Sequence, residues 1–119
     1  MGIDFSTDKP IYQQLIERII GDIIRGTLLP GEKLPSVREY AVQVGVNANT
    51  MQRVFKELEQ MEVTETKRGQ GSFVTTNVEK IETLRQQMKE ELTNSFLQSI
   101  EAFGFTTEEM IEYLKRKGE

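Results

Sequence analysis

Asn49, Gln52, Arg53 and Lys56 recur at spacings of three, one and three residues near the middle of the chain. This spacing puts the four side chains on one face of a helix, and no acidic residue interrupts the run from Asn49 to Lys56. Asn and Gln offer a donor beside an acceptor, which matches adenine in the major groove, and Arg matches guanine. A polar helix face is often merely solvated. In a chain with excess acid, this acid-free face favours DNA contact.

A second basic group lies at 67–71, where Lys67-Arg68-Gly69-Gln70-Gly71 separates two short β-branched runs at 63–66 and 72–75. This pattern predicts a hairpin with a glycine-rich basic tip. The glycines lack the spacing of a nucleotide fingerprint and join two strands, so they indicate a turn with positive φ. Because the tip follows the polar helix, we expect Lys67 and Arg68 to contact DNA.

Ser36 and Arg38 stand at the start of another predicted helix. Ser36-Val37-Arg38-Glu39 is a capping box, in which Ser36 and Glu39 satisfy each other's free amides. Free amides and a basic side chain at a helix N-terminus form an anion site, here suited to a DNA phosphate. Capping by Ser36 does not exclude that contact.

The chain contains no His and no Cys. Disulfides, thiolate nucleophiles, zinc fingers and His-based acid–base catalysis are therefore excluded. Acidic neighbours at 57/59, 90/91 and 108/109 do not face each other on a helix, so they are interpreted as solvated charges. The sequence predicts no enzyme, no cofactor and no metal site.

The elements that would position these groups begin with an amphipathic helix at about 10–25. Its apolar positions recur at three- and four-residue steps: Tyr12, Leu15, Ile16, Ile19, Ile20, Ile23 and Ile24. Asp8 is the expected N-cap, Gly26 the expected stop, and the Pro-Gly pair at 30–31 marks a turn.

Two further helices follow, one from Ser36 to the Gly45 stop and one at about 48–61, with Asn47 as N-cap. Their inner faces are predicted to be Val37, Tyr40, Ala41, Val44, Met51, Val54, Phe55, Leu58 and Met61. A short helix, a glycine turn and a helix with a polar face form a helix-turn-helix. With the hairpin, the sequence predicts an α+β, mainly helical fold, a winged helix-turn-helix.

The remaining tail is predicted to be two helices that open with capping boxes at 76–79 and 106–109 and are separated by Gly104. The first carries an apolar stripe with a mean step of about 3.67, nearer a straight helix than a coiled coil: Ile81, Leu84, Met88, Leu92, Phe96, Ile100 and Phe103. Two helices alone cannot bury both their stripes. We therefore expect 1–76 to be the DNA-binding domain and 77–119 a dimerisation appendage.

Length and charge limit the alternatives. The chain has 119 residues, 37% of them apolar, and no apolar run long enough for a membrane span. Its net charge of −4 argues against a general polyanion binder, so DNA contact requires a local basic patch. Without a secretory signal the expected location is cytoplasmic. No segment is long enough for a separate effector domain, and any small-molecule effector is unknown.

Four motifs together resemble the DNA-binding domain of the GntR family of bacterial transcription regulators: PIYQQ at 10–14, GTLLPGEKLPSVRE at 26–39, VNANTMQR at 46–53 and KRGQGSFV at 67–74. The resemblance covers about residues 8–76. The short two-helix tail and the NANTMQR run are similar to the YtrA subfamily, which lacks the large effector domain of other branches. That similarity implies control of a transporter operon and of the regulator's own gene.

The resemblance also implies roles for single residues. Arg38 matches a DNA-contacting arginine. The reading helix is matched by Asn49, Thr50, Gln52 and Arg53, and the wing that enters the minor groove is matched by Lys67, Arg68 and Gly69.

Three positions depart from the family pattern. Ala48 stands where the subfamily usually has Pro, and Gln52 where some branches use a guanine-reading Arg, so their operators do not transfer. Glu62 stands where a helix-ending Gly is usual, which costs about 1 kcal/mol if that residue is left-handed.

The sequence thus predicts a homodimeric, sequence-specific repressor that binds a near-palindromic double-stranded DNA operator, with no membrane association. A winged helix used for protein–protein contact is the first alternative, and the clean polar face and basic tip argue against it. An enzyme is the second.

Overall fold

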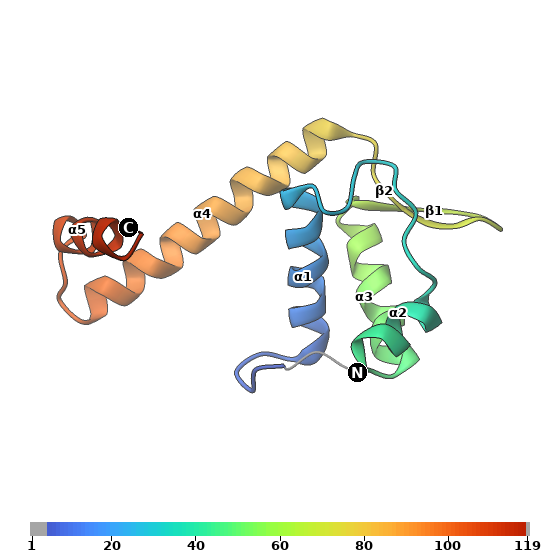
Figure 1. Ribbon diagram of the computed structural model, residues 1–119, viewed down its shortest axis with the longest axis horizontal. Coiled ribbons are helices and arrows are strands. Elements are labelled where there is room, and N and C mark those ends of the chain that lie inside the picture. The colour runs from blue at the N-terminus through green and yellow to red at the C-terminus, as the bar shows by residue number, and fades with distance from the viewer. Residues whose placement is uncertain (1–4, 119) are drawn as a thin grey trace. The chain divides into compact units, whose positions relative to one another are not determined.

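The computed structural model describes residues 5–118 and is mainly helical, with one small sheet (Figure 1). Within these residues the elements are α1 (Ile11–Arg25), α2 (Val37–Val44), α3 (Ala48–Gln60), β1 (Thr64–Lys67), β2 (Gly71–Val74), α4 (Val78–Ala102) and α5 (Thr107–Lys117). Internal contacts divide the chain into a first unit, Met1–Thr83, and a second unit, Leu84–Glu119. The predicted winged helix-turn-helix fold is confirmed.

The core of the first unit forms where α1 and α2 both pack on α3. The most deeply buried apolar side chains come from α1, α3 and β2: Leu15, Ile19, Met51, Val54, Leu58 and Val74. Tyr40 of α2 meets Phe55 of α3 edge to face, with ring centroids 6.0 Å apart. Met61, predicted to face inward, is instead 42% exposed because α3 has ended before it.

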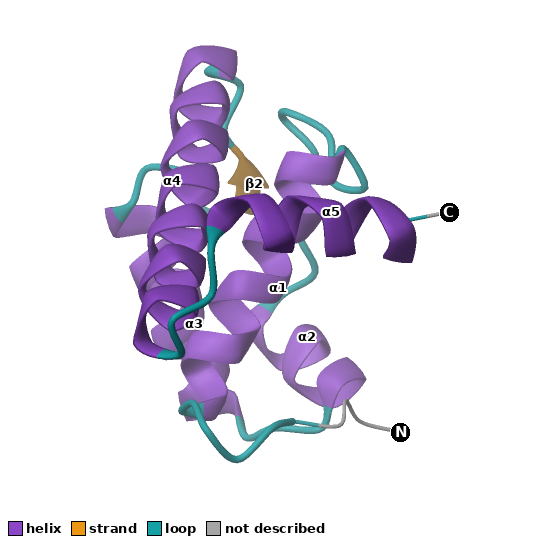
Figure 2. Cartoon of the chain, turned by 90° about the vertical axis from the view of Figure 1, so that its left-hand side faces the viewer, coloured by secondary structure: helices purple, strands orange, loops and turns teal. Residues whose placement is uncertain are grey.

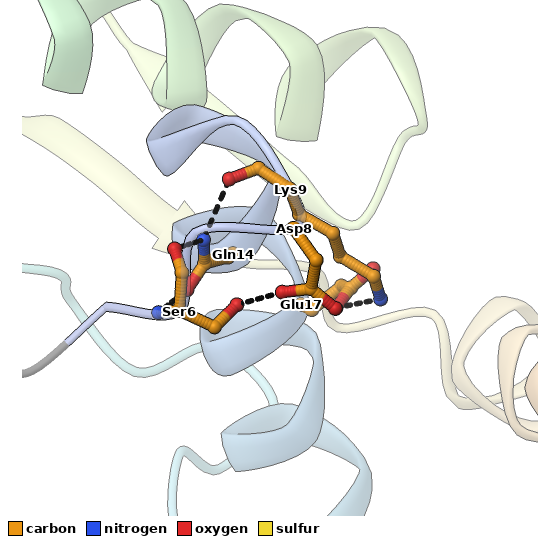
Figure 3. Close-up of polar contacts among 5 residues, drawn as sticks. All are labelled: Ser6, Asp8, Lys9, Gln14 and Glu17. Atoms are coloured by element: carbon orange, nitrogen blue, oxygen red, sulfur yellow. Dashed lines mark hydrogen bonds and ion pairs between the residues drawn. The ribbon is translucent and has the colours of Figure 1, made fainter.

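The segment before α1 is held by Gln14 rather than by a helix cap (Figure 3). The Gln14 amide donates to the carbonyl oxygens of Ser6 and Lys9, at 2.9 and 2.7 Å, and accepts from the Ser6 N–H. The expected Asp8 cap is wrong: Pro10 occupies the N-cap position and makes no side-chain cap. The Asp8 carboxylate accepts from the Ser6 hydroxyl instead, a bond that lowers its pKa.

The helix-turn-helix has the predicted ends. Ser36 and Glu39 form the capping box of α2, and left-handed Gly45 ends that helix at φ 78°. The Asn47 side chain accepts the Thr50 N–H at 2.8 Å and opens α3. These caps fix the direction of α3 relative to α2 through a very short connection.

The hairpin pairs β1 and β2 in antiparallel register, from Thr64 opposite Val74 to Lys67 opposite Gly71. The loop is Arg68-Gly69-Gln70, so Lys67 ends a strand rather than standing in the tip itself. The chain before α2 joins this two-stranded sheet through an isolated β-bridge: the Leu34 N–H donates to Ser72 O at 2.8 Å, and Lys33 is paired with Phe73.

Glu62 is the one non-glycine residue in the described chain with positive φ, at 64°. It occupies the C′ position of a Schellman motif that ends α3. The Glu62 N–H donates to Glu59 O at 2.9 Å and the Val63 N–H to Leu58 O at 3.2 Å. The departure noted in the sequence is therefore a left-handed glutamate, and its carboxylate is ion-paired with Lys80.

We expect Glu62→Gly to be more stable than Glu62→Ala by about 1 kcal/mol, because only glycine adopts left-handed φ without a Cβ clash. Both variants lose the exposed ion pair with Lys80, so the difference between their free energies of unfolding reports the backbone strain alone. Urea unfolding of the two variants measures it. Equal stability would mean that the Schellman turn relaxes around a Cβ.

The second unit contains most of α4 and all of α5, joined by a turn at left-handed Gly104 (Figure 2). Thr106 and Glu109 form the predicted capping box of α5. At the start of α4 the predicted capping box at 76–79 is wrong by one residue: the Asn77 side chain accepts the N–H groups of Glu79 and Lys80.

Among the described residues of the second unit, the buried apolar side chains are Leu84 and Ile100, each 6% exposed. Large apolar side chains remain exposed along α4, in the turn and along α5: Leu92, Phe96, Leu97, Phe103, Phe105, Ile111, Tyr113 and Leu114. Over residues 5–118, no helix is both long and apolar enough to cross a membrane.

Candidate nucleic-acid interface

The start of α2 presents Ser36 and Arg38. The Ser36 hydroxyl accepts the Glu39 N–H at 3.1 Å, and a Glu39 carboxylate oxygen accepts the Ser36 N–H at 3.0 Å. The bonds to the Ser36 N–H and hydroxyl lower the pKa of Glu39. The stabilisation that the ionised Glu39 carboxylate gives the box is therefore complete above the ordinary glutamate pKa and is lost as pH falls through the lowered one. Arg38, in the first turn, is exposed.

The polar face of α3, defined by Asn49, Gln52, Arg53 and Lys56, is exposed at every position. Thr50 beside it is half-buried, and its N–H is used by the Asn47 cap. The opposite face carries the buried side chains Met51, Val54 and Leu58. Packing thus leaves the polar face of α3 exposed.

Arg53 is held in place, which its position in the sequence did not indicate. Its guanidinium carbon lies 3.5 Å from the centroid of the Tyr12 ring on α1, and its Nε donates to Glu57 at 3.3 Å. Glu57, interpreted from the sequence as a solvated charge, is therefore a partner of Arg53. Tyr12, predicted to be core, is half-buried, with its ring covered by that guanidinium.

The wing presents Arg68 and Gly69 in its loop, while Lys67 stacks over Phe73 at 4.5 Å from the ring centroid. Gly69 has φ 78° and nothing within 4 Å of where a Cβ would stand, so its need for glycine is conformational. The wing has strands of four residues and a loop of three, so the backbone at Arg68 stays close to the sheet.

Lys33 is a residue of this surface that the sequence did not single out. It pairs with Phe73, and its Cε would lie 3.2 Å from a Cβ at Gly71, so its side chain lies along the wing. Lys33 lies inside the motif at 26–39, but the resemblance gave it no role, and only the bridge to β2 brings its side chain to Gly71 at the end of the wing loop.

The same bridge joins the wing to the start of α2. Main-chain bonds run from Gly31 to Val74, from Val74 to Glu32 and from Leu34 to Ser72, at 2.8–2.9 Å. Ser36 follows two residues later. In Figure 1 the start of α2 and the hairpin tip both lie on the side of the first unit away from α1. These main-chain bonds therefore fix the start of α2, with Ser36 and Arg38, in position relative to the wing.

Comparisons with known proteins identify the family of the chain. Residues 11–74 match the family described as "Bacterial regulatory proteins, gntR family". The HTH-type transcriptional regulator YhcF of Bacillus subtilis is 42% identical over 115 residues, covering 97% of this chain and 95% of YhcF. The HTH-type transcriptional repressor YtrA of Bacillus subtilis is 35% identical over 115 residues, covering 95% of this chain and 88% of YtrA.

Among solved structures, a GntR family transcriptional regulator from Listeria monocytogenes superposes with a TM-score of 0.89 at 38% identity, covering 94% of this chain and 98% of that one. Family and relatives are transcription regulators, so the prediction that the chain is not an enzyme is confirmed. The chain belongs to the GntR family of bacterial regulatory proteins and is a YtrA-like, DNA-binding transcriptional regulator.

Proposed function

We propose that this chain is a homodimeric repressor in which two winged helices, residues 1–76 of each copy, bind the two halves of a near-palindromic operator. The observation that carries the proposal is the set of main-chain bonds that hold the start of α2 beside the wing. The acid-free polar face of α3 adds a second exposed surface with hydrogen-bond donors. Two copies related by a two-fold axis require a site with matching symmetry.

Within each half-site the residue types suggest a division of labour. Asn49 and Gln52 read base edges from the major groove, and Thr50 supports that helix. Ser36 and Arg38 position the protein on a phosphate at the start of α2. Lys67, Arg68 and Gly69 enter the adjacent minor groove, with Lys33 beside them.

Residues 77–119 supply the dimer contact. The exposed apolar side chains of the second unit, with Leu92 at 67% and Phe103 at 77% exposure, are the kind of surface that a second copy buries. The repressor role is supported by the relative YtrA of Bacillus subtilis, which is named a transcriptional repressor. A regulator of bacterial genes works in the cytoplasm, and we place this chain there.

A gel shift with DNA from upstream of the protein's own gene tests the proposal. We expect a specific complex that survives excess scrambled duplex. Nuclease footprinting of that complex should show a symmetric protected region. Binding to neither DNA would favour the protein-contact alternative.

Arg68→Ala should weaken binding to operator and scrambled DNA alike. Each lost phosphate neutralisation flattens the log–log salt dependence by about 0.9 per protomer, so the slope should fall by about that amount for each copy. Fluorescence anisotropy at several salt concentrations measures the slope. Arg25→Ala is the matched control, since Arg25 pairs with Asp22 on its own helix and should leave the slope unchanged. An unchanged slope for Arg68→Ala would remove the wing from the interface.

A further inference from the structure

We infer that Tyr12 is a positioning residue for DNA binding and that Arg53, which it holds, is a phosphate contact rather than a base reader. The inference rests on the proposed function, because it assigns roles within the same surface. It starts from the contact between the Tyr12 ring on α1 and the Arg53 guanidinium on α3, at 3.5 Å.

The contact restrains the arginine from two directions. Its flat face lies on the Tyr12 ring, and Nε donates to Glu57 one turn along α3. The side chain is still 56% exposed. A guanidinium that stacks through its face keeps the N–H groups at its edge available for an oxygen acceptor in its plane. Tyr12 therefore fixes the guanidinium without using up its hydrogen-bonding capacity.

Helix geometry determines which part of DNA the fixed side chain can meet. At about 100° per residue, Lys56 lies close to Asn49 on the helix circumference, whereas Arg53 lies about 40° to the side of Asn49 away from Gln52. That side is the one on which α1 packs, as the Tyr12 contact requires. A helix in the major groove points its central residues at bases and its flanks at the groove walls, which are phosphates. Arg53, tied to α1, lies on a flank.

The first turn of α1 is itself well fixed. Gln14, two residues beyond Tyr12, binds the main chain of Ser6 and Lys9 through its amide, and Lys9 pairs with Glu17 at 3.1 Å (Figure 3). These contacts hold the chain that leads into α1. Tyr12 is therefore a firm support, and its displacement from Arg53 would need rearrangement of this network.

The test is a double-mutant cycle of Tyr12→Leu and Arg53→Ala in the full chain, measured by fluorescence anisotropy on operator and scrambled duplexes across salt concentrations. Arg53→Ala should weaken both DNAs alike and flatten the salt slope by about 0.9 per protomer. Tyr12→Leu should weaken both about threefold per half-site, because a released Arg53 must be ordered on binding and the strength of a partly exposed cation–π contact sets the size of that cost; the slope should stay nearly unchanged. In the Arg53→Ala background, Tyr12→Leu should have no further effect.

Tyr12→Phe keeps the aromatic face and should bind like the unaltered chain, which separates the ring contact from general packing of α1. Thermal unfolding checks that Tyr12→Leu remains folded, and the Arg53 Nε–Hε NMR signal in free protein should shift in Tyr12→Leu but not in Tyr12→Phe. Arg25→Ala is again the control for an ion-paired surface arginine.

Three results would overturn the inference: multiplicative effects of the two substitutions, binding by Tyr12→Leu equal to that of the unaltered chain, or loss of operator preference in Arg53→Ala with scrambled binding intact. The last would make Arg53 a base reader. Failure of the unaltered chain to bind any DNA would instead overturn the proposed function, and this inference with it.

Discussion

The variant carrying Leu92→Glu and Phe96→Glu is expected to sediment as a monomer at micromolar concentration, whereas we expect the unaltered chain to sediment as a dimer. Both side chains are exposed, at 67% and 40%, on neighbouring turns of α4. Two carboxylates placed on that surface would have to be buried unpaired in a dimer, which is far more costly than leaving them in water.

DNA binding should fall with the dimer. A second winged helix tethered by its partner acts at an effective concentration in the millimolar range, so its loss lowers operator affinity by about 10²- to 10⁴-fold. Fluorescence anisotropy with the full operator measures the affinity of the dimer, and anisotropy with an isolated half-site measures the affinity of one winged helix. The variant should bind the half-site as well as the unaltered chain does.

Asn94→Glu with Gln98→Glu is the matched control. It adds the same charge at two exposed positions. Because each residue turns the helix by about 100°, these positions lie on the side of α4 opposite Leu92 and Phe96. It should stay dimeric and bind the operator normally. A dimer in the Leu92/Phe96 variant, or a monomer of the unaltered chain, would exclude this apolar surface as the dimer contact.

Local chemistry made several parts of the fold predictable. The caps at Ser36, Asn47 and Thr106 and the glycine stop at Gly45 depend on side chains within three residues of the helix end, and the structure has all of them. The same reasoning failed where neighbouring polar residues compete. Asn77 caps α4 in place of Thr76, and Asp8 binds the Ser6 hydroxyl instead of capping α1.

Contacts between distant segments could not be predicted in this way. The pairing of Lys33 with Phe73 joins residues 40 positions apart, and nothing in the local pattern at 33 signals a strand. The Tyr12 contact with Arg53 likewise joins two helices. Tyr12 fitted the apolar period of its own helix, so periodicity assigned it to the core, although its ring also serves a surface arginine.

Gln52→Ala and Asn49→Ala are expected to reduce operator preference while leaving binding to scrambled DNA nearly intact. Both side chains are exposed on the polar face of α3 and carry no charge, so their loss removes no phosphate neutralisation. A lost bidentate contact to a base costs about 1–3 kcal/mol. A symmetric dimer loses it in both half-sites, so the preference should fall by the square of the factor for one half-site.

The measurement is competition anisotropy with operator, scrambled duplex, and operators changed at single base pairs. Each variant should lose discrimination at particular pairs and keep the salt slope of the unaltered chain, in contrast to Arg68→Ala. Gln60→Ala is the matched control, because Gln60 is an exposed glutamine in the last turn of the same helix, away from the start of α3 that we propose enters the groove. If both variants kept full operator preference, α3 would not be the reading element, and a winged helix that contacts another protein would become the better account of this surface.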